Sequence, residues 1–315
     1  MRYYFAPLEG LTDYIFRSVH HKYFPEGLDR YYTPFFSPTV HRALTPREAK
    51  ELPPADSLGF SVVPQLLTKV AEDFVWMSSQ CRDLGYEEVN LNLGCPSGTV
   101  TGKGKGSGML RDTDALDAFL EEIFRDSALP ISIKTRIGFY DAQEFPKLME
   151  IFNQYPIKEL TVHPRIRTAF YKGDVDMNAF RYCVEISKNP VCYNGDILSR
   201  KDAEEIRRQF PSVEAVMIGR GLIGDPGMLM PGGTDRDTLE SFLKELTEEY
   251  VAAFGGPRNA MFRLKENWGF LIHKFENSEK LWKRLRKTTD INEFKSITAE
   301  ILHTLPMKKQ EDYST

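Results

Sequence analysis

The chain has 315 residues, of which 41% are hydrophobic and 27% charged, and it carries a formal net charge of −4. A packed core of this size needs no disulfide or metal staple, and the acidic balance excludes a global positive field that would attract nucleic acid. Any RNA surface must therefore be a local patch. No apolar run reaches the roughly 20 residues of a membrane helix, and the N-terminus is too polar for a signal peptide.

The four cysteines, Cys81, Cys95, Cys183 and Cys192, form no C-x-x-C pair and no metal-like cluster. Such usage is typical of reduced thiols in a cytosolic protein. We therefore expect a cytoplasmic chain that binds neither a metal nor a membrane, and we expect it to be a monomer.

Short apolar runs alternate with amphipathic stretches from the N-terminus onward. The apolar runs predict strands at 3–7, 31–36, 61–67, 88–93, 131–135, 159–163, 191–194 and 215–218. The amphipathic stretches predict helices at 13–22, 71–83, 114–124, 142–152, 177–187 and 200–208, whereas the proline-rich residues 45–57 predict an irregular connection. Strands that alternate with helices are typical of βαβ units, and eight of them suggest an α/β fold of the (β/α)8 TIM-barrel type.

Polar side chains follow many of these strands at the same point, where each strand ends. They are Glu9, Gln65, Asn92, Cys95, Lys134, Arg136, His163, Arg165, Asn194, Asp196 and Arg220. A barrel gathers all its strand ends around one mouth, whereas an open sheet gathers only those near its switch point. This distribution favours the barrel and predicts a site at its mouth.

Beyond Pro226 the pattern changes to turns and then to helices without strands, at 239–254, 262–275, 278–287 and 291–303. We therefore expect a barrel domain at 1–235 and a small all-α domain at 236–315. The segment 258–287 has nine Lys or Arg against three Glu, a net charge of +6. Most charge runs are solvated helix faces, and this interpretation stays open beside that of an RNA surface.

Two glycine-containing segments follow the last two strands, Asn194-Gly195-Asp196 and Gly219-Arg220-Gly221. In barrels a phosphate often binds the loops after strands 7 and 8, where glycine N–H groups can approach an anion and an arginine can pair with its oxygens. Turn glycines beside a surface arginine are the alternative. We favour a phosphate site, which would suit any phosphorylated ligand.

The segment NLNLGCPSGTVTGKGKGSGML, residues 90–110, places a cysteine and several glycines after a strand. It does not match a P-loop or a dinucleotide fingerprint, because its glycines and lysines have the wrong spacing. We expect a long, mobile loop that covers an active site and that Lys103 and Lys105 bias toward an anion. Cys95, between a glycine and a proline at the root of this loop, is the candidate functional thiol, whereas the other three cysteines are expected to be buried.

Lys134 and His163 end two strands of β-branched residues, so we expect them to point into the barrel mouth. Cations there can stabilise negative charge that develops on a ligand.

With these residues placed, the chain resembles the tRNA-dihydrouridine synthases, flavin enzymes with an N-terminal barrel and a C-terminal helical domain. Six segments carry the resemblance in order: APLEGLTDYIFR at 6–17, Gln65, Asn92-x-Gly-Cys-Pro with Val100, Lys134, His163-x-Arg165, and the pair Tyr193-Asn-Gly-Asp-Ile and Met217-Ile-Gly-Arg-Gly-Leu. Leu8 and Pro164 depart from the usual pattern, as does the lysine-rich segment 102–110.

The resemblance implies that FMN is bound at the mouth and reduced by NADPH or NADH. Hydride would pass from flavin N5 to C6 of a uracil in tRNA, and Cys95 would give the proton to C5. The implied cofactor residues are Pro7, Leu8, Glu9, Gln65, Lys134, His163, Asn194, Gly195, Asp196, Gly219 and Arg220. The implied tRNA residues are Asn92, Arg165, Arg167, Lys103, Lys105, Lys283, Arg284 and Arg286, and no metal is implied.

Three other functions remain open from the sequence. The first is a flavin-dependent reductase of free pyrimidines, similar to dihydroorotate or dihydropyrimidine dehydrogenases. The second is an RNA-binding barrel without chemistry, and the third is a barrel without flavin that binds another phosphorylated metabolite. The tRNA position does not follow from the sequence.

Overall fold

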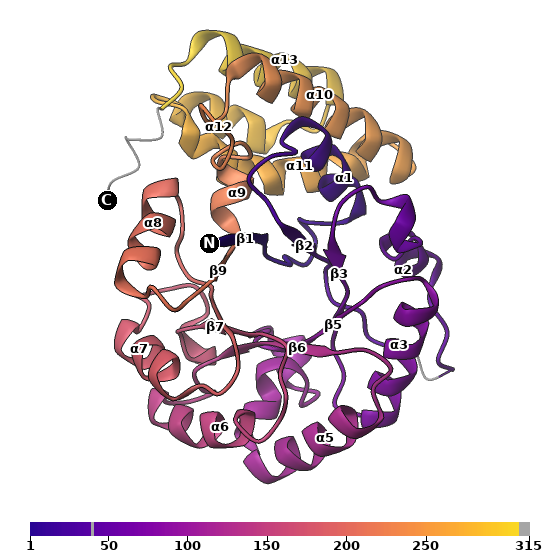
Figure 1. Ribbon diagram of the computed structural model, residues 1–315. Helices are drawn as coiled ribbons and strands as arrows, with labels where there is room; N and C mark the ends of the chain where they lie inside the picture. The colour runs from indigo at the N-terminus through magenta and orange to yellow at the C-terminus, as the bar shows by residue number, and fades with distance from the viewer. Residues whose placement is uncertain (39–40, 309–315) are drawn as a thin grey trace. The chain divides into compact units, whose positions relative to one another are not determined.

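The computed structural model describes residues 1–38 and 41–308, and its strands form a parallel β-barrel (Figure 1). The nine strands are β1 (Arg2–Phe5), β2 (Arg30–Tyr32), β3 (Val62–Val63), β4 (Gln65–Leu66), β5 (Val89–Leu93), β6 (Ile131–Arg136), β7 (Leu160–His163), β8 (Val191–Tyr193) and β9 (Ala215–Ile218). Their spatial order is β3-β2-β1-β9-β8-β7-β6-β5-β4. The two ends of this order, β3 and β4, are separated in sequence only by Pro64, so the sheet comes back on itself as a nearly closed barrel with eight strand positions.

Pro64 explains why the third predicted strand is divided. Proline has no N–H for the ladder. On its two sides β3 pairs with β2, whereas β4 pairs with β5 and Leu66 also forms an isolated parallel bridge with Phe36. The Pro64 carbonyl still accepts from Asn90 N at 2.8 Å, and Gln65 N donates to Thr33 Oγ1 at 2.9 Å instead of to a strand. The predicted barrel is confirmed, and each of the eight predicted strand segments contains observed strand residues.

Helices α3 (Ala71–Asp83), α5 (Thr113–Asp126), α6 (Phe145–Phe152) and α7 (Met177–Ile186) lie outside the ring of strands in Figure 1. Helix α8 (Arg200–Gln209) follows β8. The expectation of an irregular stretch at 45–57 was wrong, because it contains α2 (Pro46–Glu51) and the short helix η1 (Ala55–Ser57). Thr45 and Glu48 form a reciprocal capping box around Pro46, which stabilises the first turn of α2.

The chain divides into two compact units. The first comprises Met1–Pro7, Asp29–Gly195 and Ile206–Met217, and the second comprises Leu8–Leu28, Asp196–Glu205 and Ile218–Thr315. The second unit is helical, with α1 (Tyr14–Tyr23), α9 (Arg220–Gly224), α10 (Arg236–Ala253), α11 (Pro257–Leu271), η5 (Ile272–Lys274), α12 (Glu279–Lys287) and α13 (Ile291–Thr304). The predicted boundary between 235 and 236 stays a prediction.

An aromatic cluster joins α1 to α10 inside the second unit. The rings of Phe16, His20 and Phe24 contact Phe242 of α10, with the Phe16 and Phe242 centroids 5.8 Å apart. His20 Nε2 donates to the Pro226 carbonyl at 3.0 Å, and burial lowers the pKa of His20 to about 3. The neutral imidazole therefore packs as part of the core.

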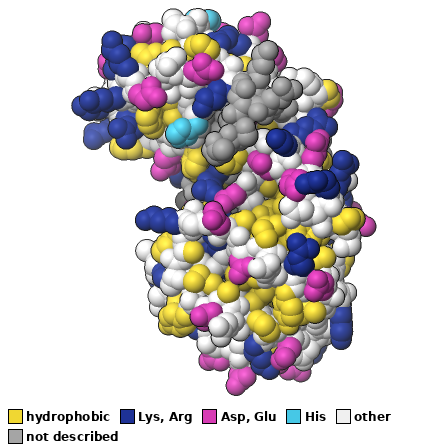
Figure 2. Space-filling model, turned by 90° about the vertical axis from the view of Figure 1, so that its left-hand side faces the viewer, with side chains coloured by type: hydrophobic (Ala, Val, Ile, Leu, Met, Phe, Trp, Pro, Cys, Tyr) yellow, Lys and Arg dark blue, Asp and Glu magenta, His cyan; other side chains and the backbone are white. Residues whose placement is uncertain are grey.

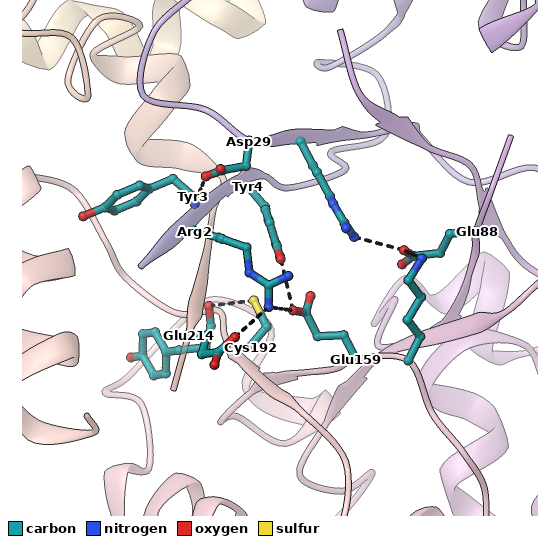
Figure 3. Close-up of polar contacts among 11 residues, drawn as sticks. Arg2, Tyr3, Tyr4, Asp29, Glu88, Glu159, Cys192 and Glu214 are labelled. Carbon is teal, nitrogen blue, oxygen red and sulfur yellow. Dashed lines mark hydrogen bonds and ion pairs between the residues drawn. The ribbon is translucent and has the colours of Figure 1, made fainter. Parts of the chain in front are cut away.

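A polar network around the buried side chains of Glu88 and Glu159 lies at the N-terminal end of the strands (Figure 3). Glu159 accepts from Tyr4 Oη at 3.1 Å and pairs with Arg2 at 3.3 Å. Glu88 pairs with Arg30 at 3.0 Å and with Lys158, whose ammonium is 2.9 Å from the same oxygen. This network is at the end of the barrel opposite the polar residues that the sequence marks as functional.

We predict that Glu159→Gln stabilises the protein at neutral pH and flattens part of its acid dependence. Burial raises the pKa of Glu159 above its ordinary value of 4.5, and the nearby Glu88 adds to this, while Arg2 and Tyr4 oppose it. The folded protein therefore holds this proton more tightly than the unfolded chain does. The destabilisation that the ionised carboxylate causes is complete at neutral pH and is relieved as the pH falls through the folded pKa.

The measurement is the free energy of unfolding of both proteins between pH 7 and pH 4. The advantage of the glutamine variant should be largest at pH 7 and should shrink toward pH 4. A difference that grows as the pH falls would contradict the assignment.

Candidate active site

A ladder of amide side chains crosses three neighbouring strands of the barrel. Gln65 of β4 is paired in register with Asn90 of β5, which is paired with Ser132 of β6. Gln65 Nε2 donates to Asn90 Oδ1 at 2.8 Å, and Asn90 Nδ2 donates to Ser132 Oγ at 2.9 Å. Asn92 Nδ2 donates to Gln65 Oε1 at 2.7 Å, so the ladder continues toward the C-terminal end of β5. Gln65 and Asn92 are buried, and their amides fix one another's orientation.

Cys95 is held at the end of β5 by this ladder. Asn92 Oδ1 accepts from the N–H groups of Gly94 at 3.1 Å and Cys95 at 2.9 Å. The Cys95 thiol side chain is half-buried, whereas Cys81, Cys183 and Cys192 are buried as expected. The Asn92 side chain thus fixes the backbone at Gly94 and Cys95. The cysteine is therefore held at the end of β5 and not on a free loop.

The expectation of a long glycine-rich loop after Cys95 was wrong. Residues there form α4 (Gly98–Thr101) and the short helix η2 (Gly106–Arg111), and the segment from Gly106 to Leu110 is buried. Ser107 donates to the Cys95 carbonyl from its Oγ at 2.8 Å and from its N–H at 3.2 Å. A Cβ on Gly106, which has φ +58°, would lie 3.1 Å from Cys95 Cβ. The positive φ and this close contact with the cysteine both favour glycine at this position.

The two lysines of this segment differ in their surroundings. Lys103 is exposed, whereas Lys105 is half-buried and donates to Ser37 Oγ at 3.2 Å. Burial lowers the pKa of Lys105 below its ordinary value.

Lys134 is a half-buried cation next to Asn92 in register, on the C-terminal half of β6. Within residues 1–38 and 41–308, its ammonium forms no hydrogen bond or ion pair. Burial lowers the pKa of Lys134 to about 8, and the charge of Arg136 adds to this effect. An ammonium in this position would be stabilised by any negative charge placed beside it.

His163 and Arg165 form a second polar group at the end of β7. His163 Nε2 lies 3.1 Å from Arg165 NH1, and the imidazole stacks on Tyr171 with centroids 6.1 Å apart. Arg165 NH2 donates to the Gly173 carbonyl at 2.5 Å. Both side chains are buried, so this group holds the loop after β7 in place.

Arg136 is a buried residue that the sequence marked as polar but to which it gave no role. Its Nε donates to the Gly94 carbonyl at 2.9 Å, and its NH1 donates to the Ile166 carbonyl at 3.0 Å. Burial lowers the pKa of Arg136 to about 10. The guanidinium thus ties the Cys95 turn to the loop after β7.

Arg167 makes a second such connection. Its Nε donates to the Pro96 carbonyl at 3.1 Å, and its NH2 donates to Thr101 Oγ1 at 3.2 Å. The structure therefore brings Gln65, Asn92 and Cys95 together with each other, and Arg167 next to the cysteine turn.

The predicted phosphate residues are distributed over both units, and each unit is described by itself. In the first, Asn194 Nδ2 donates to the Met217 carbonyl at 2.7 Å, and a Cβ on Gly195 would lie 2.9 Å from Val175 and 3.0 Å from Tyr193 Oη. In the second, Arg220 forms an ion pair with Asp196 at 2.5 Å. Gly219 is the N-cap residue of α9, and its neighbour Arg220 is the first residue of that helix.

The loop after β1 is anchored by α10 and α11 within the second unit. Leu8 N donates to Thr12 Oγ1 at 2.8 Å, and Arg263 NH1 donates to the Gly10 carbonyl at 2.5 Å. Tyr250 Oη donates to Asp13 Oδ1 at 3.2 Å. Gly10 has φ +81°, and a Cβ there would lie 2.2 Å from Arg263 NH1. Pro7, in the first unit, is half-buried, and Glu9 is exposed.

The sequence did not identify Arg263 as an anchor of this loop, because it counted Arg263 with the basic segment. Other members of that segment also serve the fold. Lys274 is buried against Asp225 with their charged atoms 2.7 Å apart, and Lys265 donates to the Arg286 carbonyl at 3.2 Å. Arg284 pairs with Glu300 at 2.9 Å.

Exposed cations nevertheless remain on α12. Within the part of the chain that the structure describes, Lys280, Lys283 and Lys287 form no ion pair. The Arg286 guanidinium lies 5.5 Å from the centroid of the Trp282 ring. Figure 2 shows several Lys and Arg side chains close together on the surface of the helices drawn at the top of Figure 1.

Among the described residues, no group of three or more His, Cys, Asp or Glu side chains is arranged to hold a metal ion. No helix in residues 1–38 and 41–308 is both long and apolar enough to cross a membrane.

The fold and the polar strand ends define a TIM barrel of the kind found in two solved enzymes. Histamine dehydrogenase from Rhizobium sp. 4-9 is 12% identical with a TM-score of 0.54, over 85% of this chain and 49% of that one, so the chain spans about half its length. Morphinone reductase is 12% identical with a TM-score of 0.50, over 72% of this chain and 84% of that one. At such identities the likeness shows the fold alone.

The family model of the dihydrouridine synthases matches residues 4–309, and the chain belongs to this family. A probable tRNA-dihydrouridine synthase of Rhizobium leguminosarum bv. phaseoli is 28% identical over 279 residues, which are 86% of this chain and 84% of that protein. The tRNA-dihydrouridine synthase B of Pasteurella multocida (strain Pm70) is 27% identical over 247 residues, or 76% of this chain and 71% of that protein. The resemblance seen in the sequence is thereby confirmed.

Proposed function

We propose that this chain reduces the C5–C6 double bond of uridines in tRNA, with FMN as cofactor and NADPH or NADH as electron donor. The observation that carries the proposal is Lys134, a half-buried ammonium without a described partner next to the Asn92–Gln65 ladder and the Cys95 turn. An unpaired cation at the C-terminal end of a barrel strand suits a ligand that gains negative charge during the reaction.

The donors around Lys134 fit a flavin. The buried amide of Gln65 and the half-buried ammonium of Lys134 suit the polar edge of an isoalloxazine ring. FMN, when bound, would supply the hydride that C6 of the uracil receives. Lys134 would stabilise the negative charge of the reduced ring, and its pKa would rise as that charge forms.

The protein's own acid would be Cys95. Its Sγ–H bond breaks as the C5–H bond of the uracil forms, and the thiolate then recovers a proton from water. Asn92 would orient the uracil edge, and Arg165 and Arg167 would hold the nucleotide after it leaves its stack. Asn92 Oδ1 already accepts a hydrogen bond from the Cys95 N–H. The same side chain would therefore align both the uracil ring and the thiol that protonates it.

We also propose roles for the other residues that the sequence singled out, and we give them separately for each unit. Asn194 and Gly195 in the first unit, and Gly219, Arg220 and Asp196 in the second, would serve the phosphate of FMN. Pro7, Leu8, Glu9 and His163 would complete the flavin contacts. Lys103, Lys105, Lys283, Arg284 and Arg286 would meet tRNA phosphates. We also propose a cytoplasmic, monomeric enzyme without a metal.

The test is mass-spectrometric analysis of nucleosides from unmodified tRNA incubated with the protein, FMN and NADPH. Dihydrouridine in the product, and its absence when the protein is omitted, is the expected result. A flavin that NADPH reduces without dihydrouridine formation would instead favour a reductase of free pyrimidines, to be checked with uracil and orotate.

We predict that charge reversal on α12 weakens tRNA binding. The double variant Lys283→Glu/Lys287→Glu changes two exposed cations one helical turn apart and spares the Arg284–Glu300 pair. Each lost phosphate contact makes the negative slope of log K against log salt shallower by about 0.9, so the magnitude of the slope should fall by roughly 2. Fluorescence anisotropy with labelled tRNA, repeated at several salt concentrations, measures both the affinity and its salt dependence.

The matched control is Lys188→Glu/Lys201→Glu, which also reverses two exposed lysines. Equal binding by both double variants would mean that α12 is only a solvated face.

A further inference from the structure

Large aromatic side chains are exposed on the loops after β6 and β7. Tyr140 is 64% exposed, Phe170 42% and Tyr171 48%. These three are half of the large hydrophobic residues that are exposed in the described part of the chain. Exposed apolar groups that gather in one place mark an interaction site, whereas scattered ones need no explanation.

Arginines alternate with the aromatic rings in this region. The Arg167 guanidinium lies 5.2 Å from the centroid of Phe139 and 5.2 Å from that of Phe170. The Arg111 guanidinium lies 5.0 Å from the centroid of Phe139, and the rings of Phe139 and Tyr140 meet edge to face with centroids 4.6 Å apart. We call these five residues, Arg111, Phe139, Tyr140, Arg167 and Phe170, the mouth platform.

The mouth platform is fixed to the turn that carries Cys95. The same Arg167 guanidinium that contacts the two rings donates to the Pro96 carbonyl at 3.1 Å, one residue beyond the cysteine. Arg167 N also donates to the Gly138 carbonyl at 2.9 Å, which joins the loop after β7 to the loop after β6. The platform therefore belongs to the same rigid group as the candidate acid.

Phe170 adopts a backbone conformation that L-residues rarely adopt, with φ 51° and ψ −104°. The turn is held by Phe170 N, which donates to the Arg167 carbonyl at 3.1 Å, and by Lys172 N, which donates to that of Ala169 at 2.8 Å. A strained backbone that leaves an aromatic side chain exposed, and not buried, is typical of a functional position.

We propose that the mouth platform stacks the nucleobases that flank the reduced uridine, so that Tyr140 and Phe170 bind bases while Cys95 meets the target. The inference rests on the proposed function. Single-stranded RNA is recognised by stacking of unpaired bases on aromatic rings and on arginine planes, and a base that leaves its stack exposes the faces of its neighbours. Guanidinium groups beside exposed rings suit the tRNA of the proposed function, because the rings stack bases while the cations attract RNA phosphates.

The test compares tRNA affinity of Tyr140→Leu and Phe170→Leu with that of the wild type. Leucine keeps an apolar side chain but removes the aromatic face, so each variant should bind unmodified tRNA roughly 5- to 150-fold more weakly. The salt slope should not change, because no phosphate contact is removed. Phe170→Tyr, which restores a ring, should recover the wild-type affinity. The control is Phe262→Leu on α11, which is as exposed as Tyr140 at 64% and should bind normally.

A second measurement identifies the RNA partner of the platform. Short single-stranded RNAs with one central uridine carry either natural or abasic neighbours, and their affinities are measured by anisotropy. Abasic neighbours should weaken binding to the wild type and should have no further effect on the Tyr140→Leu/Phe170→Leu double variant. Equal loss in both proteins, or unchanged tRNA affinity in the leucine variants, would overturn the inference. The same protein preparations are also assayed for dihydrouridine formation. If the wild-type protein forms none, the proposed function itself is refuted, separately from the role of the platform.

Discussion

The Cys95→Ala variant is expected to lose dihydrouridine formation by about 10²- to 10⁴-fold, the range for removal of a positioned general acid. The substitution removes only the Sγ–H donor. The Cys95 N–H bond to Asn92 Oδ1 and the Ser107 bonds to the Cys95 carbonyl come from the backbone, so the turn should persist in the alanine variant. Flavin content and tRNA affinity should therefore match those of the wild type.

The measurement is the single-turnover rate of dihydrouridine formation with the flavin already reduced, because this separates reduction of the uracil from reduction of the flavin by NADPH. The control is Cys81→Ala. The Cys81 thiol is buried in α3, and this burial raises its pKa to about 12. This variant should react at the wild-type rate. Full turnover by Cys95→Ala would remove Cys95 as the acid and leave water, or another side chain at the mouth, in that role.

The second large effect is expected at a buried ion pair of the helical unit. Lys274 and Asp225 are each 2% exposed, and their charged atoms are 2.7 Å apart. Thr234 Oγ1 donates to the other oxygen of Asp225 and itself accepts from Gly227 N at 2.7 Å. Lys274→Met leaves the Asp225 carboxylate buried without its counter-charge, which costs about 3–5 kcal/mol. A thermal midpoint lowered by roughly 10 °C is the expected result.

Two further variants separate the lost pair from the lost side chain. Asp225→Asn/Lys274→Met removes both charges and should recover much of the stability, since replacement of a whole buried pair is often nearly neutral. Lys280→Met removes an exposed cation from α12 and should change the free energy of unfolding by less than about 0.5 kcal/mol. Equal destabilisation by the single Lys274 variant and the double variant would show that packing, not charge, dominates at this position.

The barrel was predictable because the predicted strands are short runs, largely apolar, with polar residues near or just beyond their C-terminal ends. Lys134, Asn92 and His163 mark three such ends, and the structure places them on neighbouring strands as the barrel requires. The division at Pro64 could also have been anticipated, since proline has no N–H to donate to a ladder.

The features that the sequence missed depend on contacts between distant residues. Proline-rich residues 45–57 suggested an irregular stretch, but Thr45, Pro46 and Glu48 form the N-terminus of a helix. The glycines near Cys95 suggested a loose loop, but Gly106 is needed for close packing. A count of charges could not show that Lys274 is buried against Asp225 or that Arg263 binds the Gly10 carbonyl, because linear charge density contains no information on which face of a helix is covered.

Residues 8–28 belong structurally with the C-terminal helices, and this limits how the protein can be dissected. A fragment that ends at residue 235 would lack Phe242, Tyr250 and Arg263, and would leave the rings of Phe16 and Phe24 without the helix that covers them. Such a truncation should yield an aggregation-prone polypeptide and not an autonomous catalytic core. Grafting the helical part of one relative onto the barrel of another would likewise require three separate stretches to be exchanged, Leu8–Leu28, Asp196–Glu205 and Ile218–Thr315. Recombination at a single junction would therefore seldom produce a folded hybrid.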